Sequence, residues 1–334
     1  MEEEIRNTVQ AAQQVVVIQA DNPDADSLGS ALALEHILGD LGKNVTLYCG
    51  VHIPDYLHYM SGWDRVVDDL PQQFDLSIIV DVSTYTLLDK LEKSNQLGSL
   101  KNKPCIVLDH HATVEKKIDF TNLQIVDETV ASTGELIFRL SSFGWAVSAA
   151  AAEQLMCSIL GDTQGLTNDL TQAETYRVMA ELTELGANRP ALEEARRAYS
   201  KMPEKIYAYK GDLIKKTEFH AGGKLALVRI PQAEINEYSP LYNPAPLIQF
   251  DMLQVQGVAA AIVIKTYDDG RVTAAIRANN GFPVAAKLAE QLGGGGHDYA
   301  AGFKITDGRS YDDVKTECIR LATNLLDTAH GDIA

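Results

Sequence analysis

Acidic and histidine residues recur at four places in the first half of the chain, each close to the end of an apolar run. They occur in PDADSLGS (residues 23–30), VDVS (80–83), LDHH (108–111) and LGDTQG (160–165). Carboxylate oxygens and imidazole nitrogens bind hard or borderline divalent cations, and a mixture of the two suits Mn²⁺. Two such ions about 3.5–4 Å apart activate water and neutralise a phosphoryl group. The four segments together predict metal-assisted phosphoryl chemistry, although an isolated aspartate is more often a helix cap or a turn residue.

The elements that position these residues are predicted to be strands of a parallel sheet. Continuous apolar, β-branched runs without alternation are typical of strands covered on both faces. They occur at residues 14–20, 44–50, 75–83 and 104–111, and helical patterns occur at 28–42, 132–144 and 150–163. Strand–helix alternation indicates a doubly wound α/β domain, in which ligands bind beyond the carboxyl ends of the strands. We therefore expect the acidic segments to line one crevice.

The second half of the chain has a different pattern. Strand patterns occur at residues 224–230, 258–279 and 300–308, and helical patterns at 283–292 and 311–329. This mixture predicts a smaller, mixed α/β domain. The expected boundaries are 1–187 for the metal-binding domain, 188–205 for a connecting helix and loop, and 206–334 for the second domain.

Composition restricts the class of protein. The chain has 334 residues and a net charge of −17, which argues against a basic groove for long duplex nucleic acid. The four cysteines are scattered and form no C-x-x-C pair, as expected for small buried residues in a reducing compartment. No apolar run approaches the ~20 residues of a membrane helix, and the N-terminus lacks a signal-peptide pattern. We expect a cytoplasmic protein with no membrane partner.

The ordered segments PDADSLGS, VDVS, LDHHAT and SILGDTQG resemble the four motifs of the DHH phosphoesterase family. GGGGHDYAAGF (293–303) resembles the signature of that family's associated C-terminal domain. The length and two-domain layout are most similar to the branch of short-oligoribonucleases (nanoRNases) and pAp phosphatases. The resemblance implies a mainly parallel N-terminal sheet, a smaller mixed C-terminal domain, and an active site in the cleft between them.

The resemblance also implies roles for individual residues. By this resemblance, Asp81 would bridge two metal ions and Asp109 would orient the ring of His110. His111 would donate a hydrogen bond to a phosphate oxygen. The ions would be Mn²⁺, with Mg²⁺ and Co²⁺ as alternatives. The implied metal ligands are Asp24, Asp26, Asp81, His110 and Asp162.

One position departs from the family pattern. The family has a metal-binding histidine four residues before the first acid, where this chain has Ala20. One ion would then keep only Asp24, Asp81 and water, so we expect one complete site and one weakened site. The polar residues nearby are Gln19, Asp21 and Asn22, and the sequence aims none of them clearly at the ion.

Residues of the second domain are expected to bind the substrate. Glycines let backbone N–H groups approach a phosphate closely, and a guanidinium fork suits the same task. By themselves, a glycine run is often a turn and an arginine is often a surface ion pair. The resemblance instead implies substrate binding by Arg277, Gly294, Gly295, Gly296 and His297.

The predicted activity is hydrolysis of short oligoribonucleotides, linear dinucleotides or 3′,5′-bisphosphate nucleosides such as pAp, by metal-activated water. A homodimer is expected from the resemblance alone. Three alternatives stay open: a single-strand exonuclease, an inorganic pyrophosphatase, and a nucleotide-binding or regulatory protein with weakened catalysis. Ala20 favours the last of these, and the GGGGH segment argues against the pyrophosphatase.

Overall fold

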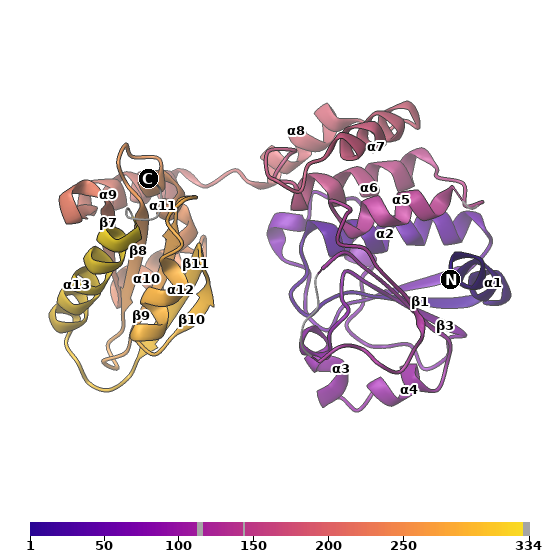
Figure 1. The fold of residues 1–334 in the computed structure, drawn as a ribbon, viewed down its shortest axis with the longest axis horizontal. Helices are drawn as coiled ribbons and strands as arrows, with labels where there is room; N and C mark the ends of the chain where they lie inside the picture. The colour runs from indigo at the N-terminus through magenta and orange to yellow at the C-terminus, as the bar shows by residue number, and fades with distance from the viewer. Residues whose placement is uncertain (112–115, 143, 330–334) are drawn as a thin grey trace. The chain divides into compact units, whose positions relative to one another are not determined.

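The computed structural model describes residues 1–111, 116–142 and 144–329 and divides into two compact units, Met1–Lys201 and Met202–Ala334 (Figure 1). The last two residues of the LDHHAT segment, Ala112 and Thr113, lie outside the described residues, as does Phe143 of the helix expected at 132–144. Helix α8 (Arg189–Tyr199), within the expected connection, belongs to the first unit.

The first unit contains a five-stranded sheet in which every pair of neighbours is parallel, so the predicted parallel sheet is confirmed. The strand order β2-β1-β3-β4-β5 reverses direction at β1, because β2 and β3 lie on opposite sides of it. Such a reversal opens a crevice beyond the carboxyl ends of the two central strands. The strands are β1 (Gln14–Ile18), β2 (Asn44–Tyr48), β3 (Leu76–Val80), β4 (Cys105–Asp109) and β5 (Leu123–Val126).

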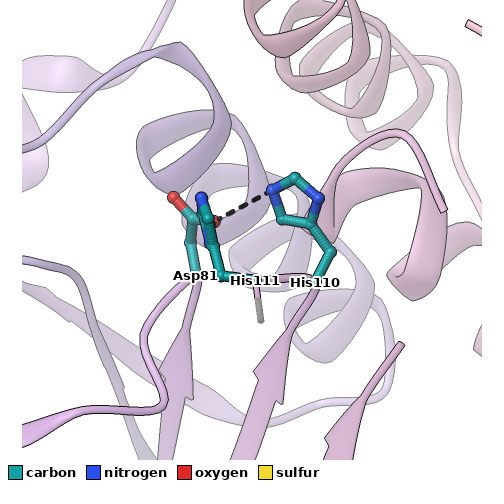
Figure 2. A group of neighbouring side chains, drawn as sticks. All are labelled: Asp81, His110 and His111. Atoms are coloured by element: carbon teal, nitrogen blue, oxygen red, sulfur yellow. Dashed lines mark ion pairs between the residues drawn. The ribbon is translucent and has the colours of Figure 1, made fainter. Parts of the chain in front are cut away.

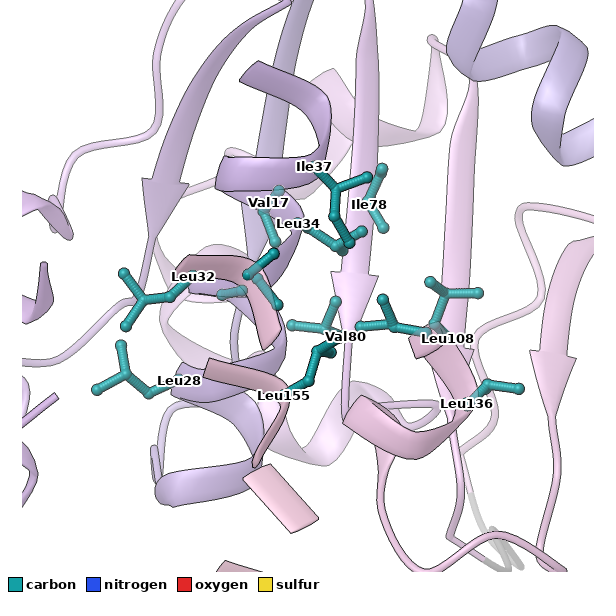
Figure 3. Packing of buried hydrophobic residues seen from close by; sticks show 14 of the residues in the cluster. Val17, Leu28, Leu32, Leu34, Ile37, Ile78, Val80, Leu108, Leu136 and Leu155 are labelled. Atoms are coloured by element: carbon teal, nitrogen blue, oxygen red, sulfur yellow. The ribbon is translucent and has the colours of Figure 1, made fainter. Parts of the chain in front are cut away.

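Helices cover both faces of this sheet. Val15 and Val17 of β1 pack in one apolar cluster with the helices α2, α5 and α6 (Figure 3). The alternate residues Val16 and Ile18 pack in a second cluster with the short helices α3 and α4. Burial on both sides explains why the strands carry continuous apolar runs. The helices are α1 (Glu2–Ala11), α2 (Ala25–Asp40), α3 (Asp89–Lys93), α4 (Leu97–Lys101), α5 (Thr133–Ser141), α6 (Ala149–Asp162), α7 (Ala173–Glu184) and α8, with the 3-10 turns η1 (Asp55–Leu57), η2 (Trp63–Arg65) and η3 (Tyr85–Leu87).

The second unit contains a six-stranded mixed sheet of order β10-β11-β9-β8-β7-β6, in which only β7 and β8 pair in parallel. Helices α12 and α13 cover one face and helices α9 and α11 cover the other. The predicted mixed second domain is confirmed. Its strands are β6 (Glu218–His220), β7 (Leu225–Pro231), β8 (Ala260–Thr266), β9 (Val272–Ala278), β10 (Gly295–His297) and β11 (Ala300–Ile305). Its helices are α9 (Glu204–Lys216), α10 (Gln232–Tyr238), α11 (Pro244–Leu253), α12 (Ala285–Gln291) and α13 (Tyr311–Ala329), with the 3-10 turn η4 (Ala221–Gly223).

In the part of the chain that the structure describes, no helix combines the length and the apolar character needed to span a bilayer. All four cysteines are buried and free, as predicted.

Candidate functional site

The candidate site lies at the carboxyl edge of the parallel sheet in the first unit. Asp81 follows β3 directly, and Asp109 is the last residue of β4. Asp26 stands in the first turn of α2, which follows β1. Figure 2 shows the side chains of Asp81, His110 and His111 gathered beyond the ends of two strands. The reversal of strand order at β1 therefore places these residues in one crevice.

Three carboxylates converge on one imidazole nitrogen. The Nε2 atom of His110 lies 2.8 Å from Asp162 Oδ2, 3.4 Å from Asp26 Oδ2 and 3.7 Å from Asp81 Oδ1. This nitrogen is buried and makes no hydrogen bond of acceptable geometry with any residue that the structure describes. Among the described residues, no lysine or arginine forms an ion pair with these three aspartates. A buried imidazole surrounded by uncompensated carboxylates is a donor set that fits a divalent cation.

The pKa shifts of these groups have burial as their largest cause and the neighbouring charges as the next. Burial, followed by the charges of Asp26 and Asp24, raises the pKa of Asp81 well above its ordinary value. Burial also raises the pKa of Asp162 to about 6, although His110 opposes the change. For His110, burial would lower the pKa, but Asp162 and Asp26 outweigh it and raise the pKa to about 9. A bound cation would relieve this concentration of negative charge.

Asp26 is held by hydrogen bonds from three elements. Its Oδ1 accepts from the hydroxyls of Ser30 and Ser158 and from the backbone N–H of Gly134. Its Oδ2 accepts from the backbone N–H of Thr133 at 2.8 Å. The backbone N–H groups of Thr133 and Gly134 lie in the first turn of α5, where they have no acceptor within the helix and where a negative charge is favoured. The sequence indicated a helix start here but not the carboxylate that its amides bind.

Asp81 has an uncommon backbone conformation. Its φ is 62°, in the left-handed region that aspartate tolerates better than most non-glycine residues. Its N–H donates to Leu108 O at 2.8 Å, and its Oδ1 accepts from Thr133 Oγ1 at 3.1 Å. These contacts fix the direction of the carboxylate. Such strain costs about 1–3 kcal/mol and is common at functional sites.

Asp109 contacts the ring of His111, not that of His110 as expected from the sequence. Its Oδ1 lies 2.9 Å from His111 Nδ1 and also accepts from the backbone N–H groups of His110 and His111. The carboxylate turns back over its own two following residues, which leaves the ring of His110 to the other three aspartates. Asp109 raises the pKa of His111, whose side chain is 57% exposed. His111 is therefore suited to donate a hydrogen bond to an anion.

Asp24 is not among the residues whose ligand atoms lie close together around His110. It is exposed and caps α2, with Oδ1 accepting from the backbone N–H of Ser27 at 3.0 Å. Its own N–H donates to the Ser27 hydroxyl, which completes a capping box. The structure thus shows Asp24 capping a helix through Oδ1 and brings together the other four predicted ligands, whereas a ligand role for Asp24 stays a prediction.

The surroundings of Ala20 contain one unused polar group. Ala20 is buried in the cluster with Ile18 and Tyr48. Asp21 accepts from the backbone N–H of Lys90, which directs its carboxylate toward α3. The carboxamide of Gln19 is fully buried and has no hydrogen-bond partner among the described residues. Nothing in these contacts replaces the missing imidazole.

Replacing Ala20 by histidine is expected to lower the Mn²⁺ concentration for half-maximal activity by about tenfold, because a lost ligand is restored. Overpacking of this buried position would cost about 1–3 kcal/mol of stability. Ala20→Leu is the matched control, since it adds volume without a ligand. An identical Mn²⁺ dependence in the native protein and Ala20→His would contradict the expectation.

In the second unit, Arg277 of β9 and His297 of β10 share one face of the sheet. Both pair directly with Ala300 of β11, so the three side chains point to the same side, and both Arg277 and His297 are exposed. Adjacent strands are about 4.7–4.9 Å apart, which places the two polar residues on either side of a small alanine. Gly294 and Gly296 approach β11 so closely that a Cβ atom would lie 2.2 Å from Gly302 O and 2.6 Å from Ala301 Cα, respectively.

Two family models match the chain. The model of the DHH family, N-terminal domain, matches residues 14–161, and the model of the DHHA1 domain matches residues 248–326. These matches confirm the family that the sequence motifs indicated.

Three known proteins illustrate the similarity. The bifunctional oligoribonuclease and PAP phosphatase NrnA of Thermus thermophilus is 29% identical over 286 residues, which cover 85% of this chain and 82% of that protein. The crystal structure of an exopolyphosphatase-related protein from Bacteroides fragilis has a TM-score of 0.82 at 22% identity. The match covers 98% of this chain and 97% of the chain in that structure. RecJ of Thermus thermophilus, solved in complex with Mn²⁺, has a TM-score of 0.54 at 15% identity. The match covers 97% of this chain and 54% of the RecJ chain. At these identities the two structures show the fold alone.

The chain therefore belongs to the DHH family and is a phosphoester hydrolase with a DHH family N-terminal domain followed by a DHHA1 domain.

Proposed function

We propose that this enzyme hydrolyses short oligoribonucleotides, linear dinucleotides and 3′,5′-bisphosphate nucleosides such as pAp to mononucleotides, with Mn²⁺ as its cation. The convergence of three carboxylates on His110 Nε2 carries the proposal. The name of the Thermus thermophilus relative supports the substrate class. The net charge of −17 favours short substrates, because a long strand needs many basic contacts.

The residues that would hold the cation are Asp26, Asp81, His110 and Asp162. A divalent ion in this position supplies charge neutralisation at the phosphoryl group and lowers the pKa of water. Asp81 is placed centrally, since its Oδ1 also lies 3.5 Å from His111 Nδ1. The hydrogen bonds to Asp26 keep its carboxylate in place whether or not the substrate is bound.

His111 would bind and orient the phosphate. Asp109 holds the His111 ring through Nδ1, so the opposite nitrogen, Nε2, is left to donate to a phosphate oxygen. In the second unit, Arg277 and His297 would bind another part of the substrate. Gly295 would let the substrate approach the backbone closely, because the space of its missing side chain is open, whereas Gly294 and Gly296 pack on β11. These roles predict losses of activity on substitution without loss of the fold.

A second candidate is a nucleotide-binding or regulatory protein with weakened catalysis. Ala20 favours it, because an alanine at this position removes one of the ligands expected for one ion. The DHHA1 match argues against the inorganic pyrophosphatase.

Titration of chelator-treated protein with Mn²⁺ separates these candidates. We expect the dinucleotide pApA and pAp to be hydrolysed, long single-stranded RNA and pyrophosphate to be poor substrates, and EDTA to abolish turnover. Chromatographic quantification of AMP measures the rate. Binding of pApA without turnover at any Mn²⁺ concentration would favour the regulatory protein, and faster hydrolysis of pyrophosphate would contradict the proposed substrate class.

A further inference from the structure

A pocket of about 530 Å³ lies within the first unit and begins at the candidate metal centre. Asp24 and Asp162 both line it, and the other walls come from η1, the end of α6 and α8. Its size is within the range of about 300–1,000 Å³ that is typical of small-molecule sites. The sequence motifs did not indicate this pocket, because its tyrosines and its arginines lie outside them.

Arg189 lines this pocket and forms no ion pair or side-chain hydrogen bond with the described residues. Its neighbour in the pocket, Arg196, is instead held by Glu193 through two hydrogen bonds. One Arg189 guanidinium nitrogen lies 3.8 Å from the position that a Cβ on Gly165 would occupy, just beyond Asp162 in the chain. An unpaired guanidinium beside acidic residues, in a protein of net charge −17, is available for an anionic ligand.

Tyr56 supplies an aromatic surface at the same pocket. Tyr56 is 59% exposed, and its hydroxyl donates to the carbonyl oxygen of Pro23, the residue before Asp24, at 3.3 Å. This hydrogen bond holds the ring close to the metal centre. Leu160 and Leu192 add apolar walls. An exposed ring with apolar neighbours suits a nucleobase, because stacking on an aromatic side chain is favourable for every base.

We propose that this pocket binds the nucleoside of the substrate and its second phosphate while the scissile phosphate lies at the metal centre. The base would stack on Tyr56, and the second phosphate would pair with Arg189. This assignment rests on the proposed function and narrows it to nucleotides with two phosphate groups on one ribose. Both pAp and a 5′-phosphorylated dinucleotide have this feature, whereas adenosine 3′-monophosphate lacks the second phosphate.

The test compares kcat/KM for pAp and for adenosine 3′-monophosphate in the native protein and in Arg189→Met. The native protein is expected to prefer pAp, and Arg189→Met is expected to reduce kcat/KM for pAp by about tenfold to a hundredfold, as for a lost charged hydrogen bond. The loss for adenosine 3′-monophosphate should be much smaller. Tyr56→Ala should lower kcat/KM for both substrates, and Tyr56→Phe should lower it less, because phenylalanine keeps the ring and loses only the hydrogen bond to Pro23 O.

Arg197→Met is the matched control, since Arg197 is exposed on the same helix, pairs with Glu193 and does not line the pocket. An unchanged ratio of the two kcat/KM values in Arg189→Met would overturn the assignment. If the native protein hydrolyses neither these two nucleotides nor pApA, the proposed function fails. Calorimetric measurement of pAp binding then tests the pocket separately. A dissociation constant for pAp that rises at least about tenfold in Arg189→Met supports the assignment of the pocket, and an unchanged dissociation constant rejects it.

Discussion

Replacing Asp81 by asparagine is expected to reduce Mn²⁺-dependent hydrolysis by at least about a thousandfold, since losing even one charge-stabilising group costs about 10²–10³ in kcat. The same change is expected to stabilise the metal-free protein. The raised pKa of Asp81 reports its burial beside Asp26 and Asp24, and a neutral side chain removes that repulsion. Asparagine also tolerates the left-handed backbone and can still accept from Thr133 Oγ1.

The expected gain in stability is about 1–2 kcal/mol, or a rise in melting temperature of about 2–8 °C for a unit of this size. Differential scanning calorimetry in EDTA measures it. Asp268→Asn is the matched control, because Asp268 is exposed in the second unit and forms no ion pair within the described part of the chain. A variant that keeps substantial activity would contradict the central position of Asp81, and one that melts earlier without metal would contradict the charge repulsion.

The fold of the site was predictable because apolar runs and acids alternate in a simple order. Parallel strands bring their carboxyl ends to one edge, so residues as distant as Asp26 and His110 could be placed together from the pattern alone. Asp162 stands at the end of a helix, and its place at the site was predicted only from the resemblance to the family. Strand β5 was missed because its residues are half-buried or exposed and its run of four is short. The sheet could therefore be predicted from its buried strands but not from its edge.

The details of the site depend on side-chain directions that a sequence does not contain. The DHH segment places Asp109 beside both histidines, and only the folded turn shows that its carboxylate contacts the ring of His111. Likewise, PDADS contains two equivalent-looking acids. The capping box with Ser27 uses Asp24, whereas the first turn of α2 directs Asp26 toward His110.

Replacing Asp26 by asparagine is the counterpart of the Asp81 experiment, with the opposite expected effect on stability. Oδ2 of Asp26 accepts from the backbone N–H of Thr133, and Oδ1 accepts from that of Gly134. Either orientation of an asparagine amide would point its NH₂ group at one of these backbone donors. A buried donor without an acceptor, together with the lost charge-assisted hydrogen bonds, is expected to cost about 2–4 kcal/mol.

Both substitutions remove one carboxylate from the same cluster, so each is the control for the other. Asp26→Asn should lose Mn²⁺-dependent activity as Asp81→Asn does, but in EDTA it should unfold at lower urea concentration than the native protein. Ser158→Ala should show a smaller loss, because it removes a single hydroxyl donor to Asp26. If Asp26→Asn were as stable as Asp81→Asn, relief of charge repulsion would dominate at both positions, and the amides of α5 would not hold Asp26 as the structure indicates.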